Sequence, residues 1–200
     1  MNASSSSTSD MSPLRVTNIT ANIKTERRFN LKKLLKMHNI RASKESTVAD
    51  KVKRFSSVVQ RLTLHDGHQV TALIYSSGQV VLVGSRSCEQ VIEAVNTFLE
   101  THHTSLTEPA SITNYAMSAA FSKRLNLSKI YELIRQNISP ELCFPFYEIE
   151  LFPSLSLSKR NTNTKAILFH SGKIIITGCK TVDDGQDMFL LIQSVVNKCS

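Results

Sequence analysis

A sixteen-residue segment occurs twice in this 200-residue chain and constrains its fold more than any other feature. Residues 71–86 read TALIYSSGQVVLVGSR, and residues 165–180 read KAILFHSGKIIITGCK. The two copies align without a gap, and four small residues recur as the pairs Ala72/Ala166, Ser77/Ser171, Gly78/Gly172 and Gly84/Gly178. A repeat of this length indicates two copies of one structural unit. Whatever surface the unit forms is therefore expected twice along the chain.

The composition is that of a globular, basic protein. Hydrophobic residues make up 41% and charged residues 20% of the chain, and the formal net charge is +8. The basic excess is uneven, because residues 1–104 hold 14 Lys and Arg against 8 Asp and Glu, and residues 105–200 hold 10 against 8. Such a charge favours a polyanionic partner, although basicity alone is a weak signal.

Several classes of site and segment are not indicated. The cysteines at 88, 143, 179 and 199 form no CxxC spacing, so we expect reduced, mostly buried thiols with no metal and no cofactor. No apolar run reaches the roughly 18–20 residues of a membrane span. No nucleophile and base set or phosphate loop is recognisable, so we do not expect an enzyme.

The patterning predicts the same order of elements in each half. We expect a Ser-rich disordered tail over 1–12, a first repeat over 13–104 and a second over 105–200, with a linker near 104–111. Strands are predicted over 16–23, 55–63, 70–75, 79–83, 112–119, 147–158, 165–169 and 173–177, with a polar connection over 41–52. Helices are predicted over 31–37, 89–99, 127–135 and 186–197, the first and third capped by Asn30 and Asn126.

The repeated hairpin is apolar on both faces. Side chains alternate across a sheet, so Ala72, Ile74 and Leu82 face one way and Leu73 and Val81 the other. Two helices in each half can cover one face of an antiparallel sheet and leave the second uncovered. An uncovered apolar face normally marks an interaction surface. The alternative, that the two open faces pack on each other within the chain or in a dimer, stays open.

Basic residues lie near the predicted strand ends. Scattered charges are usually only a solvated rim, but an apolar floor with a basic rim is what a protein needs to bind the minor groove of DNA. The rim neutralises phosphates while apolar wedges unstack base steps. The residues concerned are Lys53, Arg54, Arg61, Arg86, Lys159, Arg160, Lys173 and Lys180.

At these residues the chain resembles the TATA-box-binding protein family over roughly residues 14–196. The resemblance rests on the wedge strand RFSSVVQR at 54–61, the hairpin ALIYSSG at 72–78, the stirrup YEIELFP at 147–153 and the second hairpin ILFHSGK at 167–173. It implies an α+β fold shaped like a saddle, in which four helices cover the convex face of a ten-stranded antiparallel sheet. It also implies a nuclear initiation factor that binds and bends A·T-rich promoter DNA through the minor groove.

The resemblance also implies roles for individual residues. The wedges between base steps would be Phe55, Tyr75, Phe152 and Phe169. Asn18 and Asn114 would donate hydrogen bonds to minor-groove acceptors, which A·T and T·A pairs share. The floor beside them would consist of Leu73, Val81, Val83, Ile167, Ile175 and Thr177. Phosphates would be held by Lys53, Arg54, Arg61, Ser77, Arg86, Lys159, Ser171, Lys173 and Lys180.

Protein partners are implied as well. Glu148, Glu150 and Leu151 match the stirrup residues that hold transcription factor IIB in such proteins. The predicted closing helix of the first repeat carries only acidic charges, which predicts weakened binding of transcription factor IIA; TATA-box-binding-protein-associated factors are further expected partners. We expect a monomer on DNA, and leave open a homodimer in its absence.

Some positions depart from the family pattern and motivate a second hypothesis. Tyr75 stands in place of Phe, Gln79 in place of a phosphate-binding Lys, and Lys165 puts a charge on the floor. Ser158 replaces an Arg for which Lys159 and Arg160 are candidate substitutes. The alternative function is a related adaptor with weakened or altered DNA binding that acts mainly through protein partners.

Overall fold

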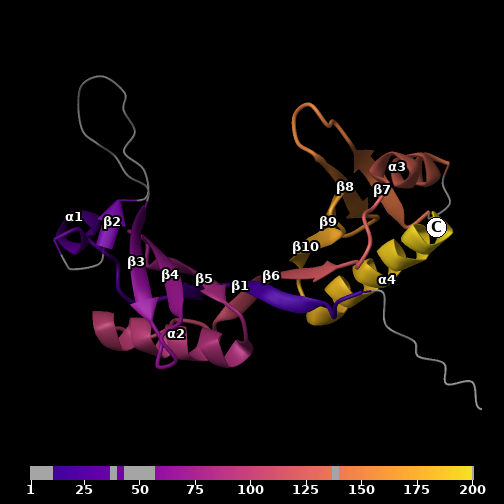
Figure 1. Ribbon diagram of the computed structural model, residues 1–200. Coiled ribbons are helices and arrows are strands. Elements are labelled where there is room, and N and C mark those ends of the chain that lie inside the picture. The colour runs from indigo at the N-terminus through magenta and orange to yellow at the C-terminus, as the bar shows by residue number, and fades with distance from the viewer. Residues whose placement is uncertain (1–10, 37–39, 43–56, 137–139, 200) are drawn as a thin grey trace, which may run out of the picture. The chain divides into compact units, whose positions relative to one another are not determined.

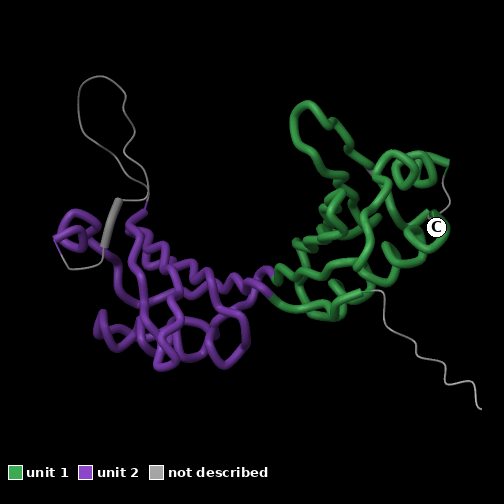
Figure 2. The backbone as a smooth tube through the Cα atoms, in the orientation of Figure 1, with its two compact units in different colours: residues 1–16, 115–200 green, residues 17–114 purple. Residues whose placement is uncertain are grey.

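The chain forms two compact units in a computed structural model, which describes residues 11–36, 40–42, 57–136 and 140–199. One unit is Thr17–Asn114, and the other joins Met1–Val16 to Tyr115–Ser200 (Figure 2). We call them the first unit and the second unit. Each contains five antiparallel strands and two helices, so the α+β class expected from the sequence is confirmed.

The strands of the first unit follow the order β2-β3-β4-β5-β1 (Figure 1). They are β1 (Arg15–Lys24), β2 (Ile40–Ala42), β3 (Ser57–Thr63), β4 (Gln69–Tyr75) and β5 (Gln79–Ser85), and the helices are α1 (Leu31–Leu34) and α2 (Cys88–His102). Asn30 caps α1 as predicted, since its side chain accepts a hydrogen bond from the Lys33 amide.

The second unit repeats this order as β7-β8-β9-β10-β6. Its strands are β6 (Ser111–Ala120), β7 (Leu142–Phe146), β8 (Ser154–Lys159), β9 (Lys165–Phe169) and β10 (Lys173–Cys179), and its helices are α3 (Leu127–Arg135) and α4 (Val182–Lys198). Asn126 caps α3 as predicted, by accepting a hydrogen bond from the Lys129 amide.

Each hydrophobic core lies between one face of a half-sheet and its helices. In the first unit α2 packs on β3 and β5, and in the second α4 packs on β10 while α3 packs on β7 and β8 (Figure 1). The buried strand residues occupy alternate positions: Val70, Ala72, Ile74, Val80 and Leu82 in the first unit, and Leu155, Leu157, Ala166, Leu168, Ile174 and Ile176 in the second. The alternation predicted for the repeated hairpin is therefore present in both copies.

The segment that leads into each repeat pairs within the other repeat's unit. Met11 bridges to Phe121 at the end of β6, and Leu106 bridges to Thr25 at the end of β1. The unit boundaries therefore differ from the repeat boundaries at residues 12–13 and 104–105. Met11 and Ser12, at the end of the expected tail, are part of this pairing.

The sequence patterns missed one strand in each repeat. β2 includes Arg41 and Ala42, which we expected in a polar connection, and it has only three residues. β7 contains Pro145, a residue tolerated at a sheet edge but a poor strand signal. The strand expected over 147–158 begins only at Ser154, because the Leu151 and Phe152 amides both bond to the Glu148 carbonyl in a turn.

The cysteines were predicted less well. Cys179 is buried and its burial raises the pKa of its thiol, but Cys88 at the start of α2 is exposed and Cys143 and Cys199 are only half-buried. The expectation of mostly buried thiols was wrong, because one of the four side chains is buried.

Candidate nucleic-acid interface

The open face of the first unit consists of rows of side chains that run across the strands. One row joins Val59, Leu73, Val81 and Asn22, and the next joins Arg61, Thr71, Val83 and Thr20. Except for exposed Arg61, these residues are half-exposed, and apart from Gly84 their neighbours along each strand are buried on the helix side. Asn18 lies on the same face of β1 and its amide approaches the Thr20 hydroxyl at 3.5 Å.

The second unit carries equivalent rows. Ser156, Ile167, Ile175 and Ser118 form one, and Ser158, Lys165 and Thr177 form the next. Lys165 is exposed in this row. Asn114, the last residue of the first unit, is half-exposed on the same face of β6 as Ser118. Thus all six predicted floor residues lie on the open faces in matched positions of the two half-sheets, with Leu73 matched by Ile167, Val81 by Ile175 and Val83 by Thr177.

Two predicted wedge residues form an aromatic pair at the edge of the second unit's open face. The rings of Phe152 and Phe169 lie 6.0 Å apart in an edge-to-face arrangement, and Phe152 is 50% exposed. Phe169 of β9 lies directly opposite Ser154 of β8 in the antiparallel pairing. In the first unit the equivalent register pair is Ser57 with Tyr75, which is half-exposed. Phe55, Lys53 and Arg54 lie outside the described residues.

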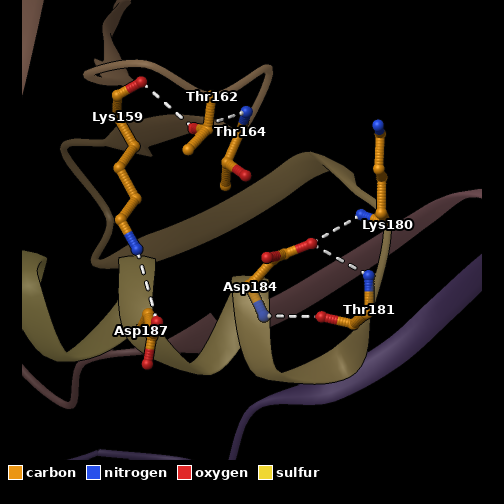
Figure 3. A network of polar contacts seen from close by, with 7 residues as sticks. All are labelled: Lys159, Thr162, Thr164, Lys180, Thr181, Asp184 and Asp187. Atoms are coloured by element: carbon orange, nitrogen blue, oxygen red, sulfur yellow. Dashed lines mark hydrogen bonds and ion pairs between the residues drawn. The ribbon is translucent and has the colours of Figure 1, made fainter.

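The predicted phosphate contacts fall into two groups. Arg61 and Lys173 are exposed on the open faces, and Ser77, Ser171, Arg86 and Lys180 are exposed in turns beside them. Lys159 differs, since it lies on the helix side of β8, where its ammonium is 3.3 Å from the Asp187 carboxylate of α4 (Figure 3). Its side chain is only 20% exposed, so it is poorly placed to reach a phosphate on the open face.

The junction that carries Lys180 is fixed by hydrogen bonds. Asp184 accepts from the Lys180 and Thr181 amides at 2.8 and 2.9 Å, while Thr181 accepts from the Asp184 amide (Figure 3). These bonds hold the pKa of Asp184 below its usual range, the Thr181 amide being the largest cause. The Lys180 backbone is therefore held rigidly while its side chain is exposed at the surface.

The predicted stirrup is an exposed turn beside the aromatic pair. Glu148, Ile149, Glu150 and Leu151 are all exposed, and Leu151 is 74% exposed. The Tyr147 ring packs 6.0 Å from that of Tyr131 on α3, which anchors one end of the turn. The turn therefore presents two carboxylates and two large apolar side chains together.

Among the described residues, no group of three or more His, Cys, Asp or Glu side chains could hold a metal ion. Over the same part of the chain, no helix is long and apolar enough to cross a membrane.

A family model described as transcription factor TFIID (or TATA-binding protein, TBP) matches residues 13–101 and 109–199. The chain belongs to the TATA-binding protein family. The two matched ranges correspond to the two repeats, and the description is that of a transcription factor, which is consistent with the expectation of a protein that is not an enzyme.

Individual TATA-box-binding proteins of archaea are similar to this chain. The Sulfurisphaera tokodaii protein is 30% identical over 66% of this chain, and the aligned part of the chain spans 63% of that relative. TATA-box-binding protein 3 of Methanosarcina mazei is 25% identical over 92% of this chain and 94% of its own. The solved TBP structure of Methanococcus jannaschii has the same fold, with a TM-score of 0.68, 22% identity and coverage of 92% of this chain and 98% of the other.

Several residues of the open faces were absent from our sequence-based set. Val59 and Thr63 flank Arg61 on β3, and Ser156 and Ser118 complete the row of Ile167 and Ile175. The two-residue alternation that starts from Arg61 could have identified the first two. Ser156 lies in a strand whose beginning was predicted wrongly, so its face could not be assigned.

Proposed function

We propose that this TATA-binding protein family member is a promoter-binding initiation factor that binds A·T-rich DNA through the minor groove. One observation carries the proposal: each half-sheet has a face of half-exposed apolar and small polar side chains that none of the described helices of its unit covers. The minor-groove edges of A·T pairs present acceptors and no donors, and apolar side chains can insert between their base steps, so such a face suits them. The exposed Arg61, Lys173 and Lys180 would neutralise phosphates beside it.

We further propose that Phe152 and Phe169 act as one wedge that bends the DNA. Their rings are already in contact at the edge of the open face, and half of the Phe152 surface is exposed. Inserting aromatic side chains between base steps compensates part of the cost of unstacking them. The target is expected to be an easily deformed A·T-rich sequence.

The test compares Phe152→Ala with Leu190→Ala, a control on α4 in the same unit. The two side chains have nearly equal exposure, 50% and 52%, but Leu190 lies on the helix side. Loss of aromatic stacking costs about 1–3 kcal/mol per base, which is about 5- to 150-fold in affinity. DNA bending measured by energy transfer between duplex ends should fall in Phe152→Ala and persist in Leu190→Ala.

Salt dependence tests the same interface independently. Affinity for an A·T-rich duplex should fall steeply with salt and exceed that for a G·C-rich duplex. Lys173→Met should reduce the slope of log affinity against log salt by about 1, whereas Lys159→Met should change it less because Lys159 is engaged with Asp187. No base-composition preference, or no salt dependence, would reject the proposal.

The stirrup supports a partner proposal. Its exposed carboxylates and apolar side chains fit a transcription factor IIB-like protein with a basic, partly apolar surface. Glu148→Arg combined with Glu150→Arg should abolish that binding and leave DNA affinity unreduced. Weakened binding to transcription factor IIA, binding to associated factors, monomeric binding to DNA and a nuclear location belong to the same proposal. A fluorescent fusion would test the nuclear location.

The alternative is an adaptor with weakened DNA binding, motivated by Gln79, which stands in place of a phosphate-binding Lys. Failure to bend A·T-rich DNA together with retained binding of a factor IIB-like protein would select it.

A further inference from the structure

Ser12 lies in a short sequence that proline-directed protein kinases can recognise. It is followed by Pro13 and, three residues on, by Arg15. Proline has no backbone N–H, so a kinase pocket that offers no acceptor at this position selects it. An arginine three residues downstream can pair with acidic or phosphate groups on the kinase. The second Ser-Pro pair, at 139–140, is followed by Glu141 and Leu142 and lacks that arginine.

Ser12 is exposed, and its hydroxyl is a structural acceptor. The Ser12 amide donates to the Ala120 carbonyl, and the Ala120 amide donates to the Ser12 Oγ, both at 2.8 Å. With the bridge between Met11 and Phe121, these bonds attach the lead-in segment 11–14 to the end of β6. A change at this oxygen therefore acts directly on the attachment.

A cavity of about 670 Å³ adjoins the lead-in segment within the second unit. Among the residues that line it, Lys123 is the charged one and none is acidic. Three carboxamide residues on α4, Gln186, Gln193 and Asn197, supply further N–H donors, and the Gln193 amide reaches the Met11 sulfur at 3.6 Å. A cation with carboxamide donors and no carboxylate is an environment suited to an anion.

We propose that Ser12 is a phosphorylation site of a proline-directed kinase and that this cavity receives the phosphoryl group. Ser12 Oγ forms a bond to the γ-phosphorus of a nucleoside triphosphate as the bond from that phosphorus to the bridging oxygen breaks. The nucleoside diphosphate leaves with the bonding electron pair, and the hydroxyl proton passes to a carboxylate of the kinase. The product carries a charge of about −1.5 to −2 beside Lys123 and the Ala120 amide.

The modification tightens the lead-in segment because charge-assisted hydrogen bonds are stronger than neutral ones. The equivalent position in the first unit gives a natural comparison. There Thr107 takes the place of Ser12, and its amide donates a hydrogen bond to the Lys24 carbonyl. The residue after Thr107 is Glu108, whereas the residue after Ser12 is Pro13. A proline-directed kinase should therefore modify Ser12 in the second unit and leave Thr107 in the first unit unmodified.

The experiment treats the full chain with a proline-directed kinase, magnesium and ATP, and locates phosphate by mass spectrometry. We expect incorporation at Ser12 and its loss in Ser12→Ala and in Pro13→Ala, which retains the hydroxyl. Hydrogen exchange of the Ala120 amide should slow about tenfold or more after phosphorylation, with Thr107 exchange unchanged. Lys123→Met should retain the phosphate and reduce the slowing.

Each other result would overturn part of the proposal. Absence of phosphate at Ser12 would reject the site, and equal incorporation in Pro13→Ala would reject its recognition by a proline-directed kinase. Phosphate at Ser12 with unchanged or faster Ala120 exchange would reject the cavity as its receiver. DNA affinity does not enter these readouts, so the outcome is separable from the function proposed above.

Discussion

The coinciding glycines of the repeated hairpin lead to a sharp stability prediction. Gly172 adopts a φ of +94°, and a Cβ added there would lie 2.6 Å from the Phe121 carbonyl oxygen and 2.7 Å from that of Lys123. Both obstacles are backbone atoms that cannot rotate away. Gly67 adopts a similar φ of +80°, but a Cβ added there meets nothing within 4 Å. Alanine substitutions at the two sites therefore separate steric contact from conformational strain.

The expected magnitudes follow from these contacts. Gly67→Ala should cost about 1–2 kcal/mol for the left-handed conformation, reduced by about 0.4–1 kcal/mol because alanine lowers the entropy of the unfolded chain. Gly172→Ala adds overpacking of about 1–3 kcal/mol. Moving the hairpin away would also weaken the bond from the Phe121 amide to the Gly172 carbonyl, a further loss of about 0.5–1.5 kcal/mol. The difference between the variants is thus roughly 1.5–4.5 kcal/mol.

Urea unfolding followed by circular dichroism measures this difference. With a denaturant slope of about 1–3 kcal/mol/M, the midpoint for Gly172→Ala should lie at least about 0.5 M below that for Gly67→Ala. Gly78→Ala should behave like Gly172→Ala, since its added Cβ would lie 2.7 Å from the Arg27 carbonyl oxygen. Equal midpoints for Gly172→Ala and Gly67→Ala would refute the close approach as the reason for glycine.

Two further predictions concern side chains in the helices. His102 is buried, and its Nε2 lies 2.7 Å from the Gln60 Oε1. Burial is the largest cause that lowers the pKa of His102, and the nearby charge of Arg27 is the next. The free energy of unfolding should therefore be greatest above about pH 6.5 and should fall with acidification by at most about 1.4 kcal/mol per pH unit. Urea titrations across pH should show this slope, and His102→Gln should flatten it. Thr181→Ala should destabilise the protein by about 1 kcal/mol through loss of the α4 cap, whereas Thr181→Gly should cost only about a few tenths; equal thermal shifts would contradict the capping role.

The core could be predicted from the sequence because its signals are local and duplicated. Alternation fixed which residues of 70–75 and 79–83 face the helices, and Asn30 and Asn126 marked two helix starts. The edges could not be predicted in the same way. β2 is too short to show alternation, and the strand predicted through Tyr147 was wrong because backbone bonds to the Glu148 carbonyl form a turn there.

The candidate site was predictable as a set of residue types but not in its charge placement. Leu73 and Ile167 lie on the open faces as their alternation required. Whether a given lysine faces the sheet or the helices depends on tertiary partners that a sequence does not reveal. Lys159 is an example. The face of β8 on which it lies could be assigned only once the start of the strand was known, and its partner Asp187 lies 28 residues further along the chain.

The corrected register also changes how the two halves compare. Arg61 in the first unit corresponds to Ser158 in the second, and Lys159 lies on the opposite face, where it contacts Asp187. Ser158 pairs directly with Lys165 on the neighbouring strand, and Arg61 pairs with Thr71. The equivalent row in each unit therefore carries one positive charge. In the first unit this charge is Arg61 on β3, and in the second it is Lys165 on β9, which corresponds to β4 of the first unit. Lys165 therefore supplies on β9 the positive charge that Arg61 supplies on β3, so this row offers a phosphate contact in both units, as the proposed DNA binding requires.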